Sequence, residues 1–130
     1  MTTQELLLCL IAALLALVLV RRYLRARSIR QYLPTEVAEK LRAKASVILL
    51  DVRTESERNA SRIKESIHIP LQRLQSRIED LQKYQSKEII CYCQTRNRSL
   101  AAAALLKRRG YTVANMKGGI TEWNFLRLRM

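Results

Sequence analysis

The segment Cys93–Ser99, Cys-Gln-Thr-Arg-Asn-Arg-Ser, places one thiol beside two guanidinium groups and several polar side chains. A cysteine reacts as its thiolate, which nearby positive charge and a helix N-terminus favour. The pattern predicts covalent chemistry on Cys93, with the backbone N–H groups from Gln94 to Ser99 holding an anion. A buried core cysteine at the end of a strand is the alternative, and the sequence leaves it open.

The flanking residues predict the elements that hold this segment. Residues 88–92 are mostly β-branched and aromatic, which is typical of a buried strand. Residues 97–109 carry a face of leucine and alanine and predict a helix that ends at Gly110. Cys93 would then lie where a strand passes into a helix. Ligands bind at such points in open parallel sheets, and anions are favoured there.

The rest of the chain alternates between strand and helix patterns. The expected elements are a helix from Pro34 to about Lys44, a strand at 47–52, a helix opened by a capping box of Thr54 and Glu57, a short strand at 67–69, an amphipathic helix at 71–83, a strand at 111–116 and a short helix at 119–126. This order predicts an α/β fold with a parallel sheet of about five strands and helices on both faces.

Four segments resemble the motifs of one known family, the rhodanese-like domains. They are Val47–Arg53, which resembles a strand ending in Asp-Val-Arg; Ile67–Pro70, which resembles Ile-Asn-Ile-Pro; Cys93–Ser99, which resembles the active-site loop C-x-x-G-x-R-[ST]; and Lys117–Trp123, which resembles a closing Gly-Gly-Ile/Met-x-x-Trp. Together they cover about residues 32 to 126 in the family's order. The resemblance implies the three-layer rhodanese fold and a sulfurtransferase.

The resemblance also implies roles for individual residues. Cys93 would accept sulfane sulfur as a persulfide from thiosulfate or a protein persulfide, and pass it to a thiol or cyanide. Arg98 would organise the loop with a partner carboxylate that the sequence does not identify, while Asp51 and Arg53 would brace it. We expect no cofactor and no metal. The single residue between Cys91 and Cys93 suits neither a zinc site nor a usual disulfide.

Two departures from the family pattern keep other functions open. Arg96 stands where the loop usually has glycine, and residues 61–66 stand where the family has Gly-His-Ile-x-Gly-Ala. A weakly active or inactive binding or sensing module at the membrane is therefore an alternative to the enzyme. A phosphatase-like or arsenate-reducing enzyme would need a longer loop, with five residues between cysteine and arginine, whereas four separate Cys93 from Arg98.

Composition limits the partners. The 130 residues include 24 Lys and Arg against 11 Asp and Glu, a formal net charge of +13. The sequence shows no helix-turn-helix, zinc or RNA-recognition pattern, so we expect anionic lipids or small anions as partners and no nucleic acid. A nucleophilic cysteine that is exposed at position 93 fits a reducing compartment.

The N-terminal region predicts a membrane anchor. Residues 6–20 are uncharged and apolar, and at about 1.5 Å per residue they span about 22 Å of a hydrocarbon core of roughly 30 Å. Neighbouring residues can lengthen the span. A cleaved secretory signal would carry basic residues before the apolar run, but this chain has Glu5 there and its arginines afterwards. A helix buried in a soluble core would need a larger domain.

The arginines after the apolar run predict the orientation. Basic residues stay on the cytoplasmic side, so we expect a single-pass protein with a cytoplasmic C-terminal domain, as in a bacterial inner membrane. The expected division is residues 1–30 for the anchor and basic segment, and residues 31–130 for the rhodanese-like domain. Two alternatives stay open for the segment that includes Tyr32: a helix along the lipid interface or a solvated linker.

Overall fold

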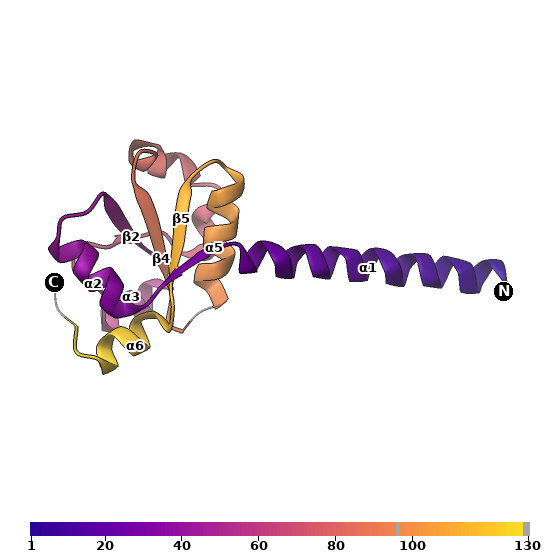
Figure 1. The fold of residues 1–130 in the computed structure, drawn as a ribbon, viewed down its shortest axis with the longest axis horizontal. Coiled ribbons are helices and arrows are strands. Elements are labelled where there is room, and N and C mark those ends of the chain that lie inside the picture. The colour runs from indigo at the N-terminus through magenta and orange to yellow at the C-terminus, as the bar shows by residue number, and fades with distance from the viewer. Residues whose placement is uncertain (96, 129–130) are drawn as a thin grey trace.

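The computed structural model describes residues 1–95 and 97–128, apart from the side chains of residues 25–27. A long helix, α1, projects from a small α/β domain (Figure 1). The elements are, in order, α1 (Thr3–Arg27), β1 (Arg30–Tyr32), α2 (Pro34–Arg42), β2 (Val47–Asp51), α3 (Glu55–Ala60), β3 (Ile67–His68), α4 (Leu71–Leu74), the 3₁₀ helix η1 (Ile78–Tyr84), β4 (Glu88–Tyr92), α5 (Asn97–Arg108), β5 (Thr112–Met116) and α6 (Gly119–Phe125).

The strands form one five-stranded sheet in the order β1-β5-β4-β2-β3, and every pairing is parallel. The carboxyl ends of all strands therefore meet at one edge. The segments that follow β2 and β4 lie beside each other there, because Asp51 pairs with Tyr92 at the ends of those strands. The predicted fold class, with a parallel sheet of about five strands between helices, is confirmed.

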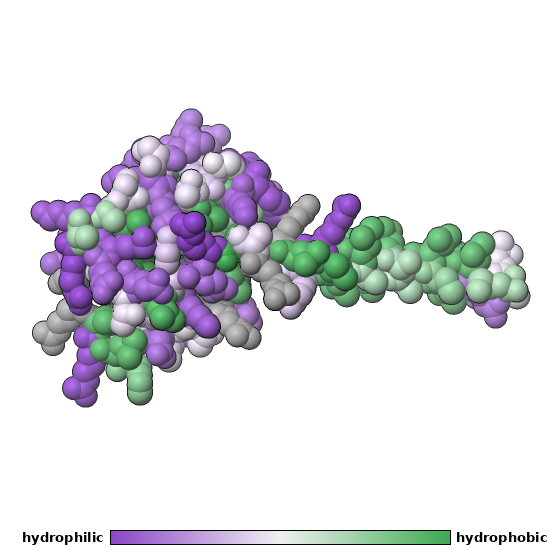
Figure 2. Space-filling model, in the orientation of Figure 1, coloured by the Kyte–Doolittle hydropathy of each residue, from purple (hydrophilic) through white to green (hydrophobic). Residues whose placement is uncertain are grey.

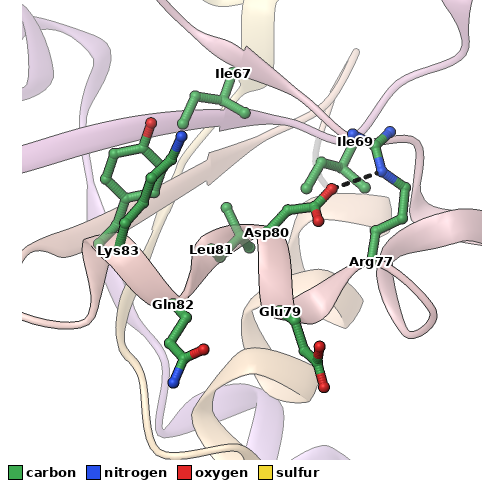
Figure 3. Close-up of a pocket in the computed structure, with 9 residues that line it drawn as sticks. Ile67, Ile69, Arg77, Glu79, Asp80, Leu81, Gln82 and Lys83 are labelled. Atoms are coloured by element: carbon green, nitrogen blue, oxygen red, sulfur yellow. Dashed lines mark hydrogen bonds and ion pairs between the residues drawn. The ribbon is translucent and has the colours of Figure 1, made fainter.

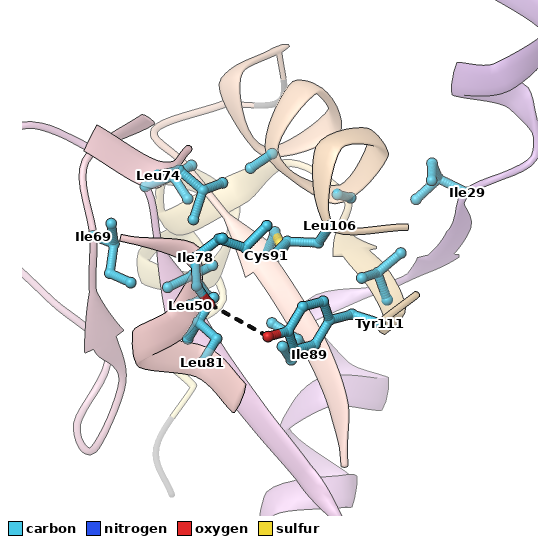
Figure 4. Packing of buried hydrophobic residues seen from close by; sticks show 14 of the residues in the cluster. Ile29, Leu50, Ile69, Leu74, Ile78, Leu81, Ile89, Cys91, Leu106 and Tyr111 are labelled. Carbon is cyan, nitrogen blue, oxygen red and sulfur yellow. Dashed lines mark hydrogen bonds between the residues drawn. The ribbon is translucent and has the colours of Figure 1, made fainter. Parts of the chain in front are cut away.

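Side chains on both faces of the sheet are buried, as expected for parallel strands connected by helices. Along β4, Ile89 and Cys91 face one layer, whereas Ile90 and Tyr92 face the other. The first layer contains α4, η1 and α5, and Figure 4 shows its side chains packed against the sheet. The second contains α2 and α6. The apolar runs in the sequence correspond to these doubly covered strands.

The segment after α1 differs from both sequence-based alternatives. Arg30–Tyr32 is a strand that pairs with β5 in register Arg30 to Ala114. Ile29 is 4% exposed and Tyr32 is 8% exposed, so both belong to the hydrophobic core. The segment is neither an interfacial helix nor a solvated linker. Its three residues are too few for a periodic pattern, and the partner strand is more than eighty residues away in sequence.

The expected continuous helix at 71–83 is also wrong. The structure has a single turn, α4, then turn residues 75–77 and the 3₁₀ helix η1. The apolar residues Ile78, Leu81 and Tyr84 recur every three positions, which matches the three residues per turn of a 3₁₀ helix. The spacing of the earlier leucines resembled the α-helical period closely enough to hide this change.

The surface of α1 is apolar along most of its length. Figure 2 shows this helix as a hydrophobic rod beside a domain whose surface is largely hydrophilic. The stretch Thr3–Leu24 is long and apolar enough to cross a membrane, and none of it is buried against the domain. Such exposed apolar area is unfavourable in water.

Candidate active site

Cys93 directly follows β4 and is held at the carboxyl edge of the sheet. Its Sγ lies 3.2 Å from Ser99 Oγ in the first turn of α5. The residue is only 1% exposed and packs with the α5 layer of the core. The expectation of an exposed cysteine is therefore wrong for this conformation. A reagent can reach Sγ only after the loop or the side chain moves.

Helix α6 covers the loop from the other side. The carbonyl of Cys93 accepts a hydrogen bond from Ile120 N at 3.0 Å, and the carbonyl of Gln94 accepts from Thr121 N at 3.2 Å and Thr121 Oγ1 at 2.9 Å. Gly119 has φ +62°, and a Cβ atom there would lie 2.5 Å from the Cys93 carbonyl oxygen. Glycine is thus required at 119 for the backbones to approach so closely.

Arg98 forms a bidentate ion pair with Glu57. Its Nη1 and Nη2 lie 2.6 and 2.8 Å from the two carboxylate oxygens. The hydrogen bonds from Arg98 lower the pKa of Glu57 to about 2, and the same pair raises the pKa of Arg98. Glu57 is the carboxylate partner that the sequence left unnamed. It also completes the predicted capping box with Thr54, so one side chain anchors both α3 and the loop.

Asp51 and Arg53 form a buried pair next to the loop. Arg53 donates to the two oxygens of Asp51 through Nε at 3.0 Å and Nη2 at 2.9 Å. Its Nη1 reaches Gln94 Oε1 at 3.2 Å. Burying two charges is tolerated here because the remaining donors and acceptors are also satisfied. Through its contact with Gln94, the pair can support the loop.

Further residues complete the network around Asp51. Tyr92 donates its hydroxyl to Asp51 Oδ2 at 3.0 Å, and Arg58 Nη1 lies 3.3 Å from the same oxygen. Ser66 contacts both Tyr92 and Arg58. Burial raises the pKa of Tyr92, so its hydroxyl stays protonated and can donate. Sequence reasoning missed these residues, because nothing local to Arg58 or Ser66 indicates contacts that depend on the fold.

Two other residues of the loop segment lie at the protein surface. Thr95 and Asn97 are exposed, and Asn97 is the first residue of α5. Arg96 lies outside the described residues. The loop thus connects a strand to a helix as predicted, and the twelve-residue helix α5 starts four positions after the cysteine.

Three residues near the loop make structural contacts. Cys91 is fully buried, and desolvation raises the pKa of its thiol to about 12, so it stays protonated. Trp123 packs in the layer of α2 and α6. His68 Nε2 lies 2.7 Å from the Arg53 carbonyl oxygen, a backbone contact that holds the segment after β2.

The described structure has a hollow away from this loop. It has a volume of about 680 Å³ and lies between β3 and η1, where Arg77, Asp80 and Lys83 are among its lining residues (Figure 3). None of the described loop residues, 93–95 and 97–99, lines it. Cys93 itself is covered in this conformation.

Comparisons with known proteins agree with this geometry. The rhodanese-like domain family matches residues 33–125. A sulfurtransferase of Allochromatium vinosum is 30% identical over 88 residues, covering 67% of this chain and 80% of that protein. The Bacillus subtilis protein YtwF, which carries a provisional sulfurtransferase name, is 27% identical over 95 residues, covering 73% of this chain and 90% of that protein.

A solved structure shows the same architecture. The rhodanese-related protein of Thermoplasma volcanium superimposes with a TM-score of 0.69 at 28% identity, covering 75% of this chain and 93% of that one. The sulfurtransferase names among the relatives support a role of that type. The sheet, the loop after β4 and the closing helix α6 agree with the family match. Because that match covers most of the chain, this protein belongs to the rhodanese-like domain family.

Proposed function

We propose that the protein is a membrane-anchored sulfurtransferase that carries sulfane sulfur as a persulfide on Cys93. The observation that carries the proposal is the placement of Cys93 between the end of β4 and the N-terminus of α5, in a loop fixed by the Arg98–Glu57 ion pair. A helix N-terminus and the loop N–H groups favour negative charge at this point. A persulfide carries that charge on its terminal sulfur.

The reaction takes place in two displacements. The Cys93 thiolate attacks the outer sulfur of thiosulfate, the sulfur–sulfur bond of the donor breaks, and sulfite leaves with the bonding electron pair. An acceptor such as cyanide or a thiolate then attacks the terminal sulfur of the persulfide and restores the Cys93 thiolate. The covalent intermediate divides one difficult transfer into two easier displacements. The loop N–H groups between Gln94 and Ser99 would stabilise the sulfur anion.

Arg98 and Arg53 hold the loop in its conformation and do not contact the donor. Both terminal nitrogens of Arg98 contact Glu57, so we assign Arg98 to loop geometry and not to donor binding. Arg53, which is held by Asp51, donates directly to the Gln94 side chain and supports the loop there. Because Cys93 is 1% exposed, turnover requires an opening of the loop or a rotation of its side chain.

Mass spectrometry after treatment with thiosulfate tests the chemistry directly. The intact protein should gain about 32 Da, one sulfur atom, and the gain should map to Cys93 and disappear on addition of cyanide. Cys93→Ser should show no gain while keeping its circular dichroism spectrum. Cys91→Ser is the matched control and should gain sulfur normally. A gain on Cys91 or Cys9 that survives Cys93→Ser would reject the assignment.

The burial of Cys93 supports a second candidate, a rhodanese-like module that binds or senses without turnover. A closed loop fits a protein that presents its surface and does not process a donor. In that case thiosulfate and protein persulfides would leave the mass unchanged at any concentration, and Cys93→Ser would not alter the protein's function in its host.

We further propose that α1 spans the membrane and that the domain faces the cytoplasm. The stretch Thr3–Leu24 has 22 residues, about 33 Å at 1.5 Å per residue, which matches a hydrocarbon core of roughly 30 Å. A signal sequence meets the same criteria of length and composition. The two differ on extraction: a spanning protein stays with membranes in sodium carbonate and keeps residues 1–24, whereas a cleaved signal is absent from the mature protein.

A further inference from the structure

A second hollow lies where α1 enters the domain. It has a volume of about 260 Å³, and its lining includes Ser28, Arg30, Lys107 and Thr112. Lys107 Nζ donates to the Ser28 carbonyl oxygen and lies the same 3.2 Å from Ser28 Oγ, so the last turn of α5 is tied to the end of α1. Figure 1 shows α5 beside this junction. We refer to the cavity and these residues as the junction site.

The charge around the junction site is mostly positive. Lys107, Arg108 and Arg109 are exposed at the end of α5, and Arg21 and Arg22 are exposed on α1. A favourable interaction with the dipole of α5 explains cations in its last turn, but it does not explain a cavity beside them.

Glu88 is the one carboxylate among the described residues that line the cavity, and it already has partners. The hydroxyl of Tyr32 lies 2.9 and 3.1 Å from the two oxygens of Glu88, and Arg30 Nη1 lies 3.8 Å from the same group. An anion that enters the cavity therefore meets a carboxylate whose charge is partly balanced. It also meets Lys107, whose ammonium group has three donors and can bind an acceptor besides Ser28.

The position along α1 sets the depth of the junction site. Ser28 directly follows the end of α1 and lies four residues beyond the apolar stretch Thr3–Leu24, or about 6 Å at the helical rise of 1.5 Å per residue. Arg30 begins β1 two residues later. The polar layer on each side of the hydrocarbon core is roughly 5 to 8 Å thick. If α1 spans the bilayer, the cavity lies at the level of the lipid phosphates.

We propose that the junction site binds the headgroup of an anionic phospholipid, with the phosphate beside Lys107 and Arg30. Arg108 and Arg109 contact neighbouring anionic headgroups. This inference rests on the membrane anchor proposed above. A lipid bound at the junction site holds α5 against the membrane surface and limits the orientations of the domain. The domain is then attached to the membrane by more than α1 alone.

Lipid binding to the full chain in detergent micelles tests the proposal. Native mass spectrometry would count phosphatidylglycerol and phosphatidylcholine molecules retained by the wild type, by Lys107→Gln/Arg108→Gln and by Arg62→Gln/Lys64→Gln. The control pair removes the same charges from exposed positions near β3, at the opposite edge of the sheet from β1. Circular dichroism would establish that each protein is folded.

The wild type and the control should retain phosphatidylglycerol in preference to phosphatidylcholine. The Lys107→Gln/Arg108→Gln variant should lose this preference by roughly tenfold or more, since a well-placed basic residue contributes roughly fivefold in binding. Equal losses in both variants, or no preference in the wild type, would overturn the proposal. Carbonate extraction of the same proteins reports on the anchor separately: release of all three would reject the membrane span, while the lipid preference in micelles still reports on the junction site.

Discussion

Replacing Glu57 by glutamine isolates the ion pair that fixes the candidate active-site loop. Glutamine keeps the shape of the side chain and can still complete the capping box with Thr54, so α3 should remain. What is lost is the charge that faces Arg98 at 2.6 and 2.8 Å. The variant therefore tests the loop contact apart from the helix cap.

The structure sets the size of the effect. A fall of the Glu57 pKa from 4.5 to about 2 corresponds to an upper limit of about 3.4 kcal/mol, at about 1.36 kcal/mol per pH unit. The side chains of Arg98 and Glu57 are 32% and 27% exposed, so water screens part of this. We expect Glu57→Gln to lower the free energy of unfolding by about 1–2 kcal/mol at neutral pH.

The sign of the pH dependence follows from the lowered pKa. The ion pair stabilises the folded state fully above the ordinary pKa of 4.5, and this stabilisation disappears as the pH falls towards about 2. The stability difference between wild type and Glu57→Gln should therefore be constant from neutral pH down to about 5 and shrink below it. Transfer of sulfur from thiosulfate to cyanide should slow by about tenfold in the variant, because the loop is less well ordered.

Denaturant unfolding followed by the fluorescence of Trp123, the single tryptophan, measures the stability. Glu55→Gln is the matched control, since Glu55 lies in the same turn of α3 and is exposed. It should change stability by less than about 0.5 kcal/mol. If Glu57→Gln and Glu55→Gln were equally mild, or if the difference persisted unchanged at low pH, the assigned role of the ion pair would be wrong.

Three further predictions concern the loop and the domain boundary. Gly119→Ala should destabilise the protein by at least about 2 kcal/mol more than Gly110→Ala in the same denaturant assay. Both positions have positive φ, but only a Cβ atom at 119 would meet carbonyl oxygens, those of Cys93 and Gln94, at 2.5 and 2.6 Å. Equal losses of stability would mean that this close contact has no importance. Deleting residues 1–27 should leave a folded domain, whereas deleting residues 1–32 removes β1 with Ile29 and Tyr32 and should cost about 3–5 kcal/mol; equal melting temperatures would contradict a structural role for β1. Arg96→Gly should raise kcat for thiosulfate through a better-formed anion-binding loop, while raising KM and weakening the salt dependence through the lost charge; a lower kcat with unchanged salt dependence would mark Arg96 as a structural residue.

Local patterns in the sequence determined the class of fold and most of the elements, but not β1 or the break after α4. The apolar runs before Asp51 and Cys93, the glycine after α5 and the capping box of Thr54 and Glu57 each concern neighbours along the chain. Their physical signals, side-chain period and capping chemistry, are complete within a few residues. The motifs around Cys93 and Trp123 fixed the family for the same reason, because their order and spacing can be read along the chain.

Contacts between distant segments were decided only by the tertiary structure. Glu57 meets Arg98 across 41 residues, and Arg30 pairs with Ala114 across the sheet. No local pattern encodes either partner, since the first contact needs β2 beside β4 and the second needs β1 beside β5. The burial of Cys93 belongs to the same class: a cysteine after a strand has the same sequence whether its loop is open or closed. The sequence by itself thus determined most of the elements and the candidate nucleophile, because these depend on neighbours along the chain. The packing of α5 and α6 over the loop decided the partners of Cys93 and its access to solvent.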